Sequence, residues 1–167
     1  MRNVRIAGNR VFLEEHEELV EVWSGGSESP AHHSSICCWA LSPNEQHLIT
    51  LDQGGQIKIW DLQRRRGERR VWDGAGFADA TAVATTNGGQ RLAVAHGLTV
   101  KVYKTVVLAN PWERDKLVPL GTMDVPLEEK VVSLTFEADN QLLCRDVRDR
   151  IMAFWQPEQP PWQRKIL

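Results

Sequence analysis

The chain has 167 residues, 42% of them apolar and 25% charged, with a formal net charge of −2. This length suits one hydrophobic core, and the near-neutral charge excludes a generic polyanion binder, because no overall field attracts phosphate. Three cysteines are too few for a secreted disulfide scaffold. No apolar run approaches the ~18 residues of a membrane span, and the polar start of the chain lacks the apolar core of a signal peptide. The composition therefore predicts a cytoplasmic protein with no membrane partner.

Short apolar runs separated by turn residues recur along the chain. After a strand fragment at Val4–Ile6, strands are predicted at Arg10–Glu14, Glu18–Trp23, Ser35–Leu41, His47–Leu51 and Gln56–Asp61. Ser42-Pro43-Asn44-Glu45 and Asp52-Gln53-Gly54-Gly55 are the turns of the middle group. The run that ends in Trp60-Asp61 alternates polar and apolar residues, as a strand with one buried face does.

The same order of strands returns in the second half of the chain. Strands are predicted at Ala80–Thr85, Arg91–Ala95, Thr99–Lys104, Val131–Phe136, Gln141–Arg145 and Arg150–Phe154, with outer strands at Arg69–Trp72 and Leu117–Met123. Aligning the groups on Trp60 places Trp23, Tyr103 and Phe154 at its position. The spacing brackets a repeat of ~40–45 residues, and no sustained helical period is present. The chain is therefore predicted to be all-β.

The segment Ala31–Asp61 resembles one WD40 repeat in its order of strand, Ser-Pro turn, strand, Gly-rich turn and strand ending in Trp-Asp. The resemblance implies a divergent WD40-like β-propeller segment of three to four four-stranded blades, about three and a half repeats of an incomplete ring. The repeats are expected at about 1–24, 31–73, 76–126 and 127–155, within one segment (1–155) that precedes a Pro-rich tail (156–167). A different sheet repeat of similar period, such as a sandwich, stays open.

The resemblance also implies a buried network of Asp, His, Ser/Thr and Trp in each blade. In the second repeat it assigns His32, Thr50 and Trp60, but Gly54 stands at the aspartate position, so a partial network is expected. The same position holds Glu17, Gly97 and Arg148 in the other repeats. Stability is then expected to come mainly from apolar packing between blades, at roughly 25 cal/mol per Å². Gly54→Asp is expected to be neutral or stabilising.

Candidate partner-binding residues lie outside the repeat markers; they are Arg64, Arg65, Arg66, Arg69, Arg70, Trp72, Trp112 and Trp162. The Arg64–Arg70 run suits either a phosphate clamp or a solvated outer loop. Tryptophan near arginine is typical of protein–protein hot spots. Trp39 lies in an inner strand, where it is compatible with the core. An acidic cluster, Glu14 to Glu21, suits a solvated sheet edge or a surface that steers assembly.

Metal and catalytic sites are not predicted. His32, His33, Cys37 and Cys38 are ligand types at the wrong spacing for zinc, and adjacent strand residues point to opposite faces, so buried thiols are expected. No nucleophile or phosphate-loop motif is present. A site assembled from Asp146 and Asp149 stays the enzyme alternative.

These observations lead to the hypothesis of a non-catalytic protein–protein interaction scaffold or sensor without a cofactor. Its partner would be another copy or a second chain that completes the propeller. Nucleic-acid or phosphate binding through Arg64–Arg70 is the alternative. An open arc is expected to leave an apolar blade face bare at each end, which predicts that the isolated chain self-associates.

Overall fold

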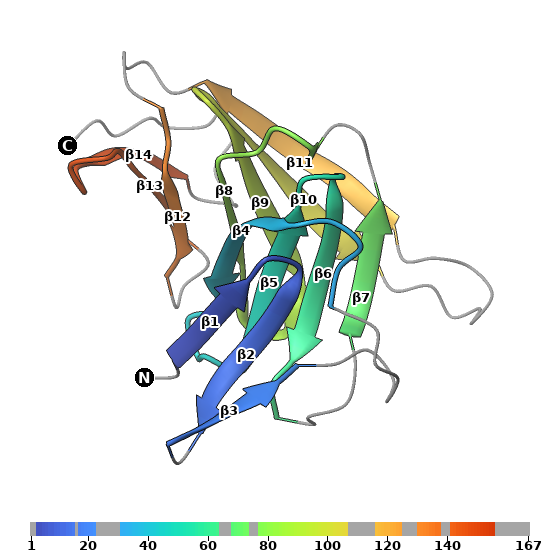
Figure 1. The fold of residues 1–167 in the computed structure, drawn as a ribbon. Helices are drawn as coiled ribbons and strands as arrows, with labels where there is room; N and C mark the ends of the chain where they lie inside the picture. The colour runs from blue at the N-terminus through green and yellow to red at the C-terminus, as the bar shows by residue number, and fades with distance from the viewer. Residues whose placement is uncertain are drawn as a thin grey trace.

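The computed structural model describes residues 3–15, 17–22, 31–63, 68–73, 77–106, 116–124, 130–137 and 141–155. Within these residues the chain is built of β-strands (Figure 1): β1 (Asn3–Ala7), β2 (Arg10–Glu15), β3 (Glu18–Glu21), β4 (Ile36–Leu41), β5 (His47–Asp52), β6 (Gln56–Asp61), β7 (Glu68–Asp73), β8 (Ala82–Thr85), β9 (Arg91–His96), β10 (Thr99–Val106), β11 (Lys116–Asp124), β12 (Ser133–Phe136), β13 (Leu142–Arg145) and β14 (Ile151–Trp155). A short 3-10 turn, η2 (Asn87–Gly89), precedes β9.

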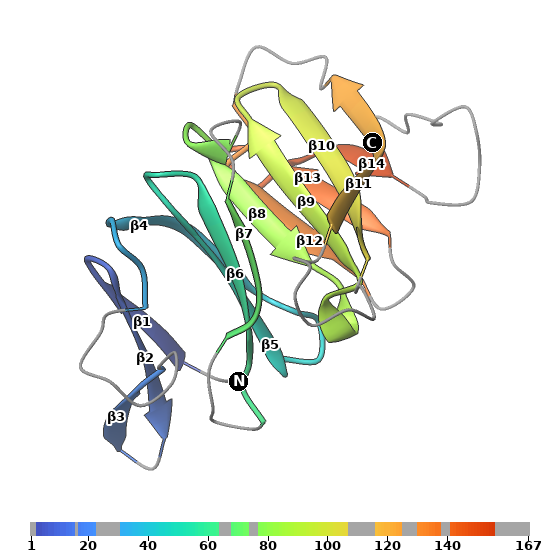
Figure 2. The ribbon, with the colours of Figure 1, turned by 90° about the vertical axis from the view of Figure 1, so that its right-hand side faces the viewer.

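The strands form four antiparallel sheets, and within each sheet neighbours in sequence are hydrogen-bonded neighbours. The sheets are β1-β2-β3, β4-β5-β6-β7, β8-β9-β10-β11 and β12-β13-β14. Figures 1 and 2 show them stacked in chain order. Stacked antiparallel meanders are the blades of a β-propeller, so the predicted all-β propeller segment is confirmed. The division into one segment (1–155) and a tail stays a prediction, since 156–167 lie outside the described residues.

The hydrophobic core consists of three layers between successive sheets. Val11 and Trp60 belong to the layer between the first two sheets. Ile59 and Leu92 belong to the second layer, and Phe136 to the third. Each of these side chains is at most 2% exposed. Because β5 and β6 are covered on both faces, their sequences carry apolar residues at consecutive positions.

The predicted strands match the observed ones to within two residues at almost every end, and both outer strands, β7 and β11, are present. The prediction was wrong, however, about the first sheet. The backbone N–H of Ile36, which precedes β4, donates to the carbonyl of Gly8 in the β1–β2 turn at 2.9 Å. The corresponding bond of the later sheets runs from Val131, before β12, to Gly97 in the β9–β10 turn, also at 2.9 Å.

The β1–β2 turn is therefore the equivalent of the β9–β10 turn, and β1 corresponds to β9 and β5. Figure 1 agrees, because β1 runs in the direction of β5 and opposite to β4. The alignment of Trp23 on Trp60 is displaced by one strand, and Trp23 itself lies outside the described residues. Within the described part of the chain, the first sheet has no counterpart of the innermost strands β4, β8 and β12.

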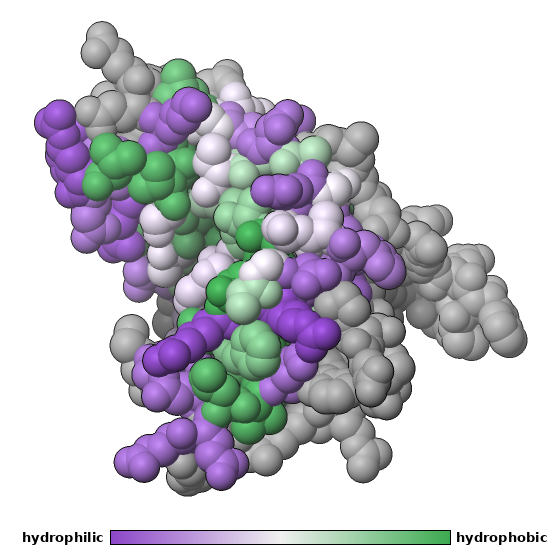
Figure 3. Space-filling model, viewed as in Figure 1, coloured by the Kyte–Doolittle hydropathy of each residue, from purple (hydrophilic) through white to green (hydrophobic). Residues whose placement is uncertain are grey.

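The outer face of the first sheet carries both charged and apolar side chains. Val4, Ile6, Val11 and Leu13 pack toward the second sheet, whereas Arg5, Arg10, Glu14 and Glu21 form cross-strand ion pairs on the other face. Phe12 and Leu19 lie on that face as well, opposite Glu21 and Glu14, and Leu19 is 51% exposed. Arg10 Nη1 lies 3.0 Å from Glu21 Oε1, and Arg5 Nη2 lies 3.9 Å from Glu14 Oε2. In Figure 3 hydrophilic and hydrophobic residues are interleaved over this sheet.

At the first end of the arc the expected bare apolar face is therefore found only in part, because ion pairs lie beside its apolar side chains. Self-association of the chain stays a prediction. Among the residues that the structure describes, no helix is long and apolar enough to cross a membrane.

Trp60→Ala should lower the free energy of unfolding by about 3–5 kcal/mol, because it opens a cavity between two sheets that cannot close around it. The measurement is denaturant unfolding. Trp39→Ala is the matched control; its side chain is 43% exposed, so the loss should be about 1 kcal/mol or less. Equal losses for the two variants would show that the core is misplaced.

Candidate functional site

A buried hydrogen-bond network ties the β5–β6 turn to the segment before β4. Trp60 Nε1 donates to Thr50 Oγ1 at 2.8 Å, and Thr50 Oγ1 lies 2.7 Å from His32 Nε2. His32 Nδ1 lies 3.2 Å from Asp52 Oδ2. One assignment satisfies all four groups: the Thr50 hydroxyl donates to Nε2, and Nδ1–H donates to the Asp52 carboxylate. Each of these residues is at most 2% exposed.

The network in the second repeat is therefore complete, and the expectation of a partial one was wrong. Its carboxylate comes from Asp52 at the end of β5, not from position 54. Burial opposes ionisation of Asp52, but the backbone N–H of Gln56, the Ser34 hydroxyl and His32 outweigh it. The pKa of Asp52 consequently lies below its ordinary value. These contacts hold two turns together, which makes the network a structural element.

The fourth sheet has a second carboxylate at the equivalent place. Asp146 Oδ1 accepts hydrogen bonds from the backbone N–H groups of Arg148 and Arg150 at 2.8 and 3.0 Å, and Oδ2 accepts one from Arg150 Nε at 2.7 Å. Burial opposes its charge, but these bonds and the Arg150 charge lower the pKa of Asp146 to about 2. Asp149 is 88% exposed and lies 3.5 Å from Arg145. The aspartate position of the repeat, which the sequence alignment had placed at Arg148, is thus filled by Asp146. This carboxylate is engaged in the β13–β14 turn.

The pairing of strands shows which residues of the later sheets occupy the position of Trp60. Tyr103 pairs with Leu92 as Trp60 pairs with Leu48, which agrees with its predicted position. In the fourth sheet a bulge shifts the register, so that Trp155 rather than Phe154 is opposite Leu142. The assignment of Phe154 was therefore displaced by one residue. Asp61, at the end of β6, is partly exposed and its carboxylate accepts a hydrogen bond from the backbone N–H of Gln63 at 3.0 Å.

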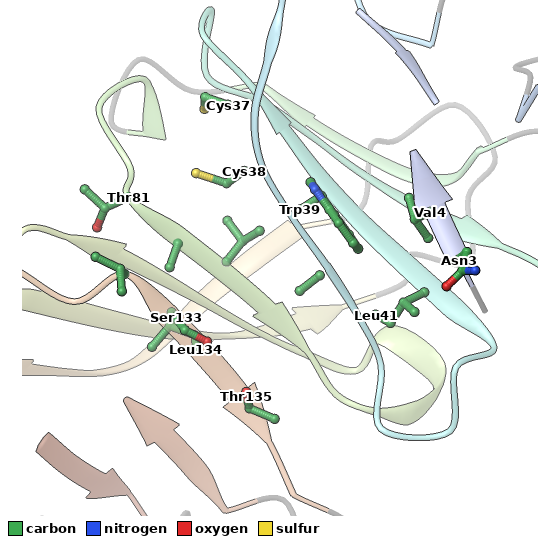
Figure 4. Close-up of a pocket in the computed structure, with 14 residues that line it drawn as sticks. Asn3, Val4, Cys37, Cys38, Trp39, Leu41, Thr81, Ser133, Leu134 and Thr135 are labelled. Carbon is green, nitrogen blue, oxygen red and sulfur yellow. The ribbon is translucent and has the colours of Figure 1, made fainter. Parts of the chain in front are cut away.

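An uncharged groove of about 750 Å³ lies along the innermost strands (Figure 4). Its lining residues are Asn3, Val4, Cys37, Cys38, Trp39, Ala40, Leu41, Thr81, Ala82, Val83, Val132, Ser133, Leu134 and Thr135. They come from β1, β4, β8, β12 and the residues next to these strands. In Figure 4, Trp39 and Leu41 lie at the end near Val4, away from Ser133.

Trp39 is the largest exposed side chain of the groove, at 43%. The reading of Trp39 as compatible with the core was therefore wrong. Cys38 and Ala40 pack toward the third sheet, so the alternate residue Trp39 faces the side of the first sheet. The apolar run of β4 gave no sign of this, because apolar residues stand on both of its faces.

The cysteines beside Trp39 differ in exposure. Cys37 is exposed and Cys38 is buried, and the register of β4 shifts between Ile36 and Cys38. Burial, followed by the charge of Cys37, raises the pKa of Cys38 to about 12, and its Sγ donates to the carbonyl of Ala80 at 3.2 Å. Burial also raises the pKa of Cys144 to about 12. The expectation of buried thiols is confirmed for Cys38 and wrong for Cys37.

Three of the predicted partner-binding residues lie on a described strand away from the groove. Arg69, Arg70 and Trp72 lie on β7, the outermost strand of the second sheet, at the opposite edge from β4. The others, Arg64, Arg65, Arg66, Trp112 and Trp162, lie outside the described residues. His32 is part of the buried network and His33 is exposed. No group of three or more His, Cys, Asp or Glu that could hold a metal occurs in the described ranges.

Comparison with known proteins gives likenesses of structure and not of sequence. No family model and no curated protein matches the chain. Among solved structures, it is similar to the crystal structure of the β-propeller domain of Myceliophteria thermophila Cps50 (Swd1), with 17% sequence identity and a TM-score of 0.48. The match covers 79% of this chain and 38% of that one, so this chain spans well under half of the length of that domain.

Gly54→Asp should destabilise the protein by about 1–3 kcal/mol. A Cβ at this position would lie 3.3 Å from both Asp52 Oδ1 and Ser34 Oγ, so the new carboxylate would face an existing one. Gly54→Asn is the matched uncharged control and should cost less when both variants are unfolded by denaturant at pH 7. A stabilising Gly54→Asp would mean that the network lacks its acid after all.

Asp146→Asn should make the free energy of unfolding depend less on pH below about pH 4. The folded pKa of Asp146 is about 2, below the ordinary value of about 3.9. Its contribution is therefore complete above about pH 4 and is lost as the pH falls toward 2. Denaturation midpoints of the variant should be lower than those of the wild type at pH 6, with the gap narrowing between pH 4 and 2. A gap that is constant across this range would contradict the assignment.

Proposed function

We propose that the chain is a non-catalytic protein–protein interaction module of the WD40-repeat type, and that its recognition surface is the groove on the innermost strands. The repeat type is supported by the meander order of the sheets and by the network of His32, Asp52, Thr50 and Trp60. The rigid sheets hold the groove in place, as recognition surfaces require. The proposed partner is a polypeptide.

The observation that carries this proposal is an uncharged groove with an exposed tryptophan. None of the fourteen lining residues that the structure describes is charged, and Trp39 is 43% exposed among them. Tryptophan in a surface depression is the usual anchor of a protein interface, because it removes a large apolar area from water and offers one N–H donor. Thr81, Ser133 and Asn3 add neutral polar groups to the lining. The volume of about 750 Å³ is in the range that holds a ligand or a few residues of a peptide.

Nucleic acid fits the same surface poorly. Binding of phosphates requires Lys or Arg side chains, and the lining has none among the residues that the structure describes. Arg69 and Arg70 are separated from the groove by the width of the second sheet. No observation on the described residues favours the phosphate-binding alternative over the polypeptide.

The non-catalytic part of the proposal is supported by the environment of the groups whose pKa values depart from the ordinary ones. Asp52 and Asp146 are engaged in turns, and the raised pKa of Cys38 keeps this thiol protonated near neutral pH. A cytoplasmic location belongs to the same proposal and rests on the composition of the sequence.

Selection of peptides from a displayed library of random decamers tests the proposal. Peptides selected on the wild-type chain should bind Trp39→Ser at least tenfold more weakly, since the loss of an anchor typically exceeds 1.4 kcal/mol. The double variant Arg69→Ser/Arg70→Ser is the control and should bind them as the wild type does. Thermal melts establish that both variants are folded.

Two results would overturn the polypeptide-binding function. One is a library that yields no peptide whose binding depends on Trp39. The other is loss of peptide binding in the double arginine variant together with unchanged binding in Trp39→Ser. A parallel titration with single-stranded RNA at two salt concentrations would then show whether the Arg run binds phosphates.

A further inference from the structure

The innermost strands form a layered series that stops at β4. β8 packs on β4, and β12 packs on β8. The first sheet should continue the series on the other side of β4, but its first described strand, β1, corresponds to β5. In the part of the chain that the structure describes, the place beside β4 therefore holds no strand.

The exposures of three equivalent side chains reflect this gap. Each innermost strand directs side chains at the preceding sheet. Val83 of β8 is covered by the second sheet and is 2% exposed, and Leu134 of β12 is covered by the third sheet and is 4% exposed. Trp39 of β4 faces the first sheet and is 43% exposed. The tryptophan is thus exposed because the preceding sheet, as far as its residues are described, has no innermost strand to cover it.

The other wall of the gap is a strand edge. β1 is the end strand of its sheet, so the N–H and C=O groups of every second residue point away from β2. Asn3 and Val4 of β1 line the same groove as Trp39. A strand edge on one side and an apolar side chain on the other are the two features that strand addition uses.

We propose that the groove is a slot for one β-strand of a partner polypeptide, which pairs antiparallel with β1, covers Trp39 and completes the first sheet to four strands. This rests on the proposed function and names the form of its ligand. The strand would run in the direction of β4, β8 and β12. Because β1 has five residues, the slot takes a segment of about that length.

The faces of β1 determine the sequence of that strand. Residues opposite Val4 and Ile6 lie on the side of the core between the first two sheets, so apolar residues fit there. The residue between them lies opposite Arg5, whose side chain is 64% exposed, and an acidic residue fits this position. Polar residues fit opposite Asn3 and Ala7, which are exposed. The expected ligand therefore alternates as polar, apolar, acidic, apolar, polar.

A tethered strand tests the slot directly. The segment Thr-Val-Glu-Val-Thr followed by an Asn-Gly turn is placed ahead of Asn3 in the full chain, so that a two-residue hairpin delivers the strand in the required register. We expect the melting temperature to rise by about 4 °C or more, and the amide protons of β1 to exchange more slowly. Val-Thr-Glu-Thr-Val with the same turn is the matched control; it has the same composition but directs threonine at Trp39, and should give neither effect.

The same two peptides, synthesised free, test binding between chains. The first should bind at millimolar concentration or tighter, should lose binding when its valines are N-methylated, and should slow the exchange of β1 amides. Equal effects of the two tethered strands, or no effect of either, would overturn the slot. If library peptides bind through Trp39 and leave β1 exchange unchanged, the proposed function holds and strand addition is wrong. If the wild-type chain is a dimer and the tethered strand converts it to a monomer, the slot is occupied by a second copy of the chain. That result would contradict the assignment of the slot to a different polypeptide.

Discussion

The structure depends on one constraint: a sheet in this stack has two faces, and each face must be covered by another sheet or made polar. The inner sheets meet it by apolar packing on both faces, which produces the consecutive buried residues of β5 and β6. The first sheet meets it only in part, with apolar residues toward Trp60 and the Arg10–Glu21 pair beside Phe12 and Leu19 on the outer face. Exposed ion pairs stabilise little by themselves, but charged side chains on this face oppose sheet-on-sheet association.

Packing between faces leaves the height of one sheet against the next undetermined, and polar contacts at one rim determine it. The bond from Ile36 to Gly8 and the His32–Asp52 contact both join the entry of β4 to a hairpin turn. A shift of one residue would break these bonds and leave buried polar groups unpaired, at about 1–3 kcal/mol each. The third and fourth sheets use the same device, with Val131 bonded to Gly97. The rim is therefore where the register of the arc is set.

Local patterns predicted the strands and turns well, because alternation and turn residues act over a few positions. They failed for features that depend on contacts between residues far apart in the sequence. Moving the first group by a whole strand preserves the period-two pattern, and it takes the contact between Gly8 and Ile36 and the direction of β1 to distinguish the two alignments. Counting back from Ile57 placed the aspartate position of the repeat at Gly54. The turn instead folds so that Asp52 supplies the carboxylate, which accepts a hydrogen bond from Gln56 N–H at 2.9 Å. The exposure of Trp39 was hidden in the same way, since an apolar run does not say which face lacks a neighbour.

The groove results from the need to cover each sheet face together with the polar contacts at the rim. Rim contacts fix β1 as the counterpart of β5, and this leaves the space beside β4 without an innermost strand among the described residues. A polar residue at position 39 would suit such a site if water were its permanent neighbour, yet the chain places its largest side chain type there, beside Val4 and Leu41. Exposed tryptophan costs roughly 25 cal/mol for each Å² left in water, and that free energy becomes available to whatever covers it. An uncharged wall, an edge strand and an uncovered aromatic side chain therefore favour a polypeptide over a polyanion as the ligand.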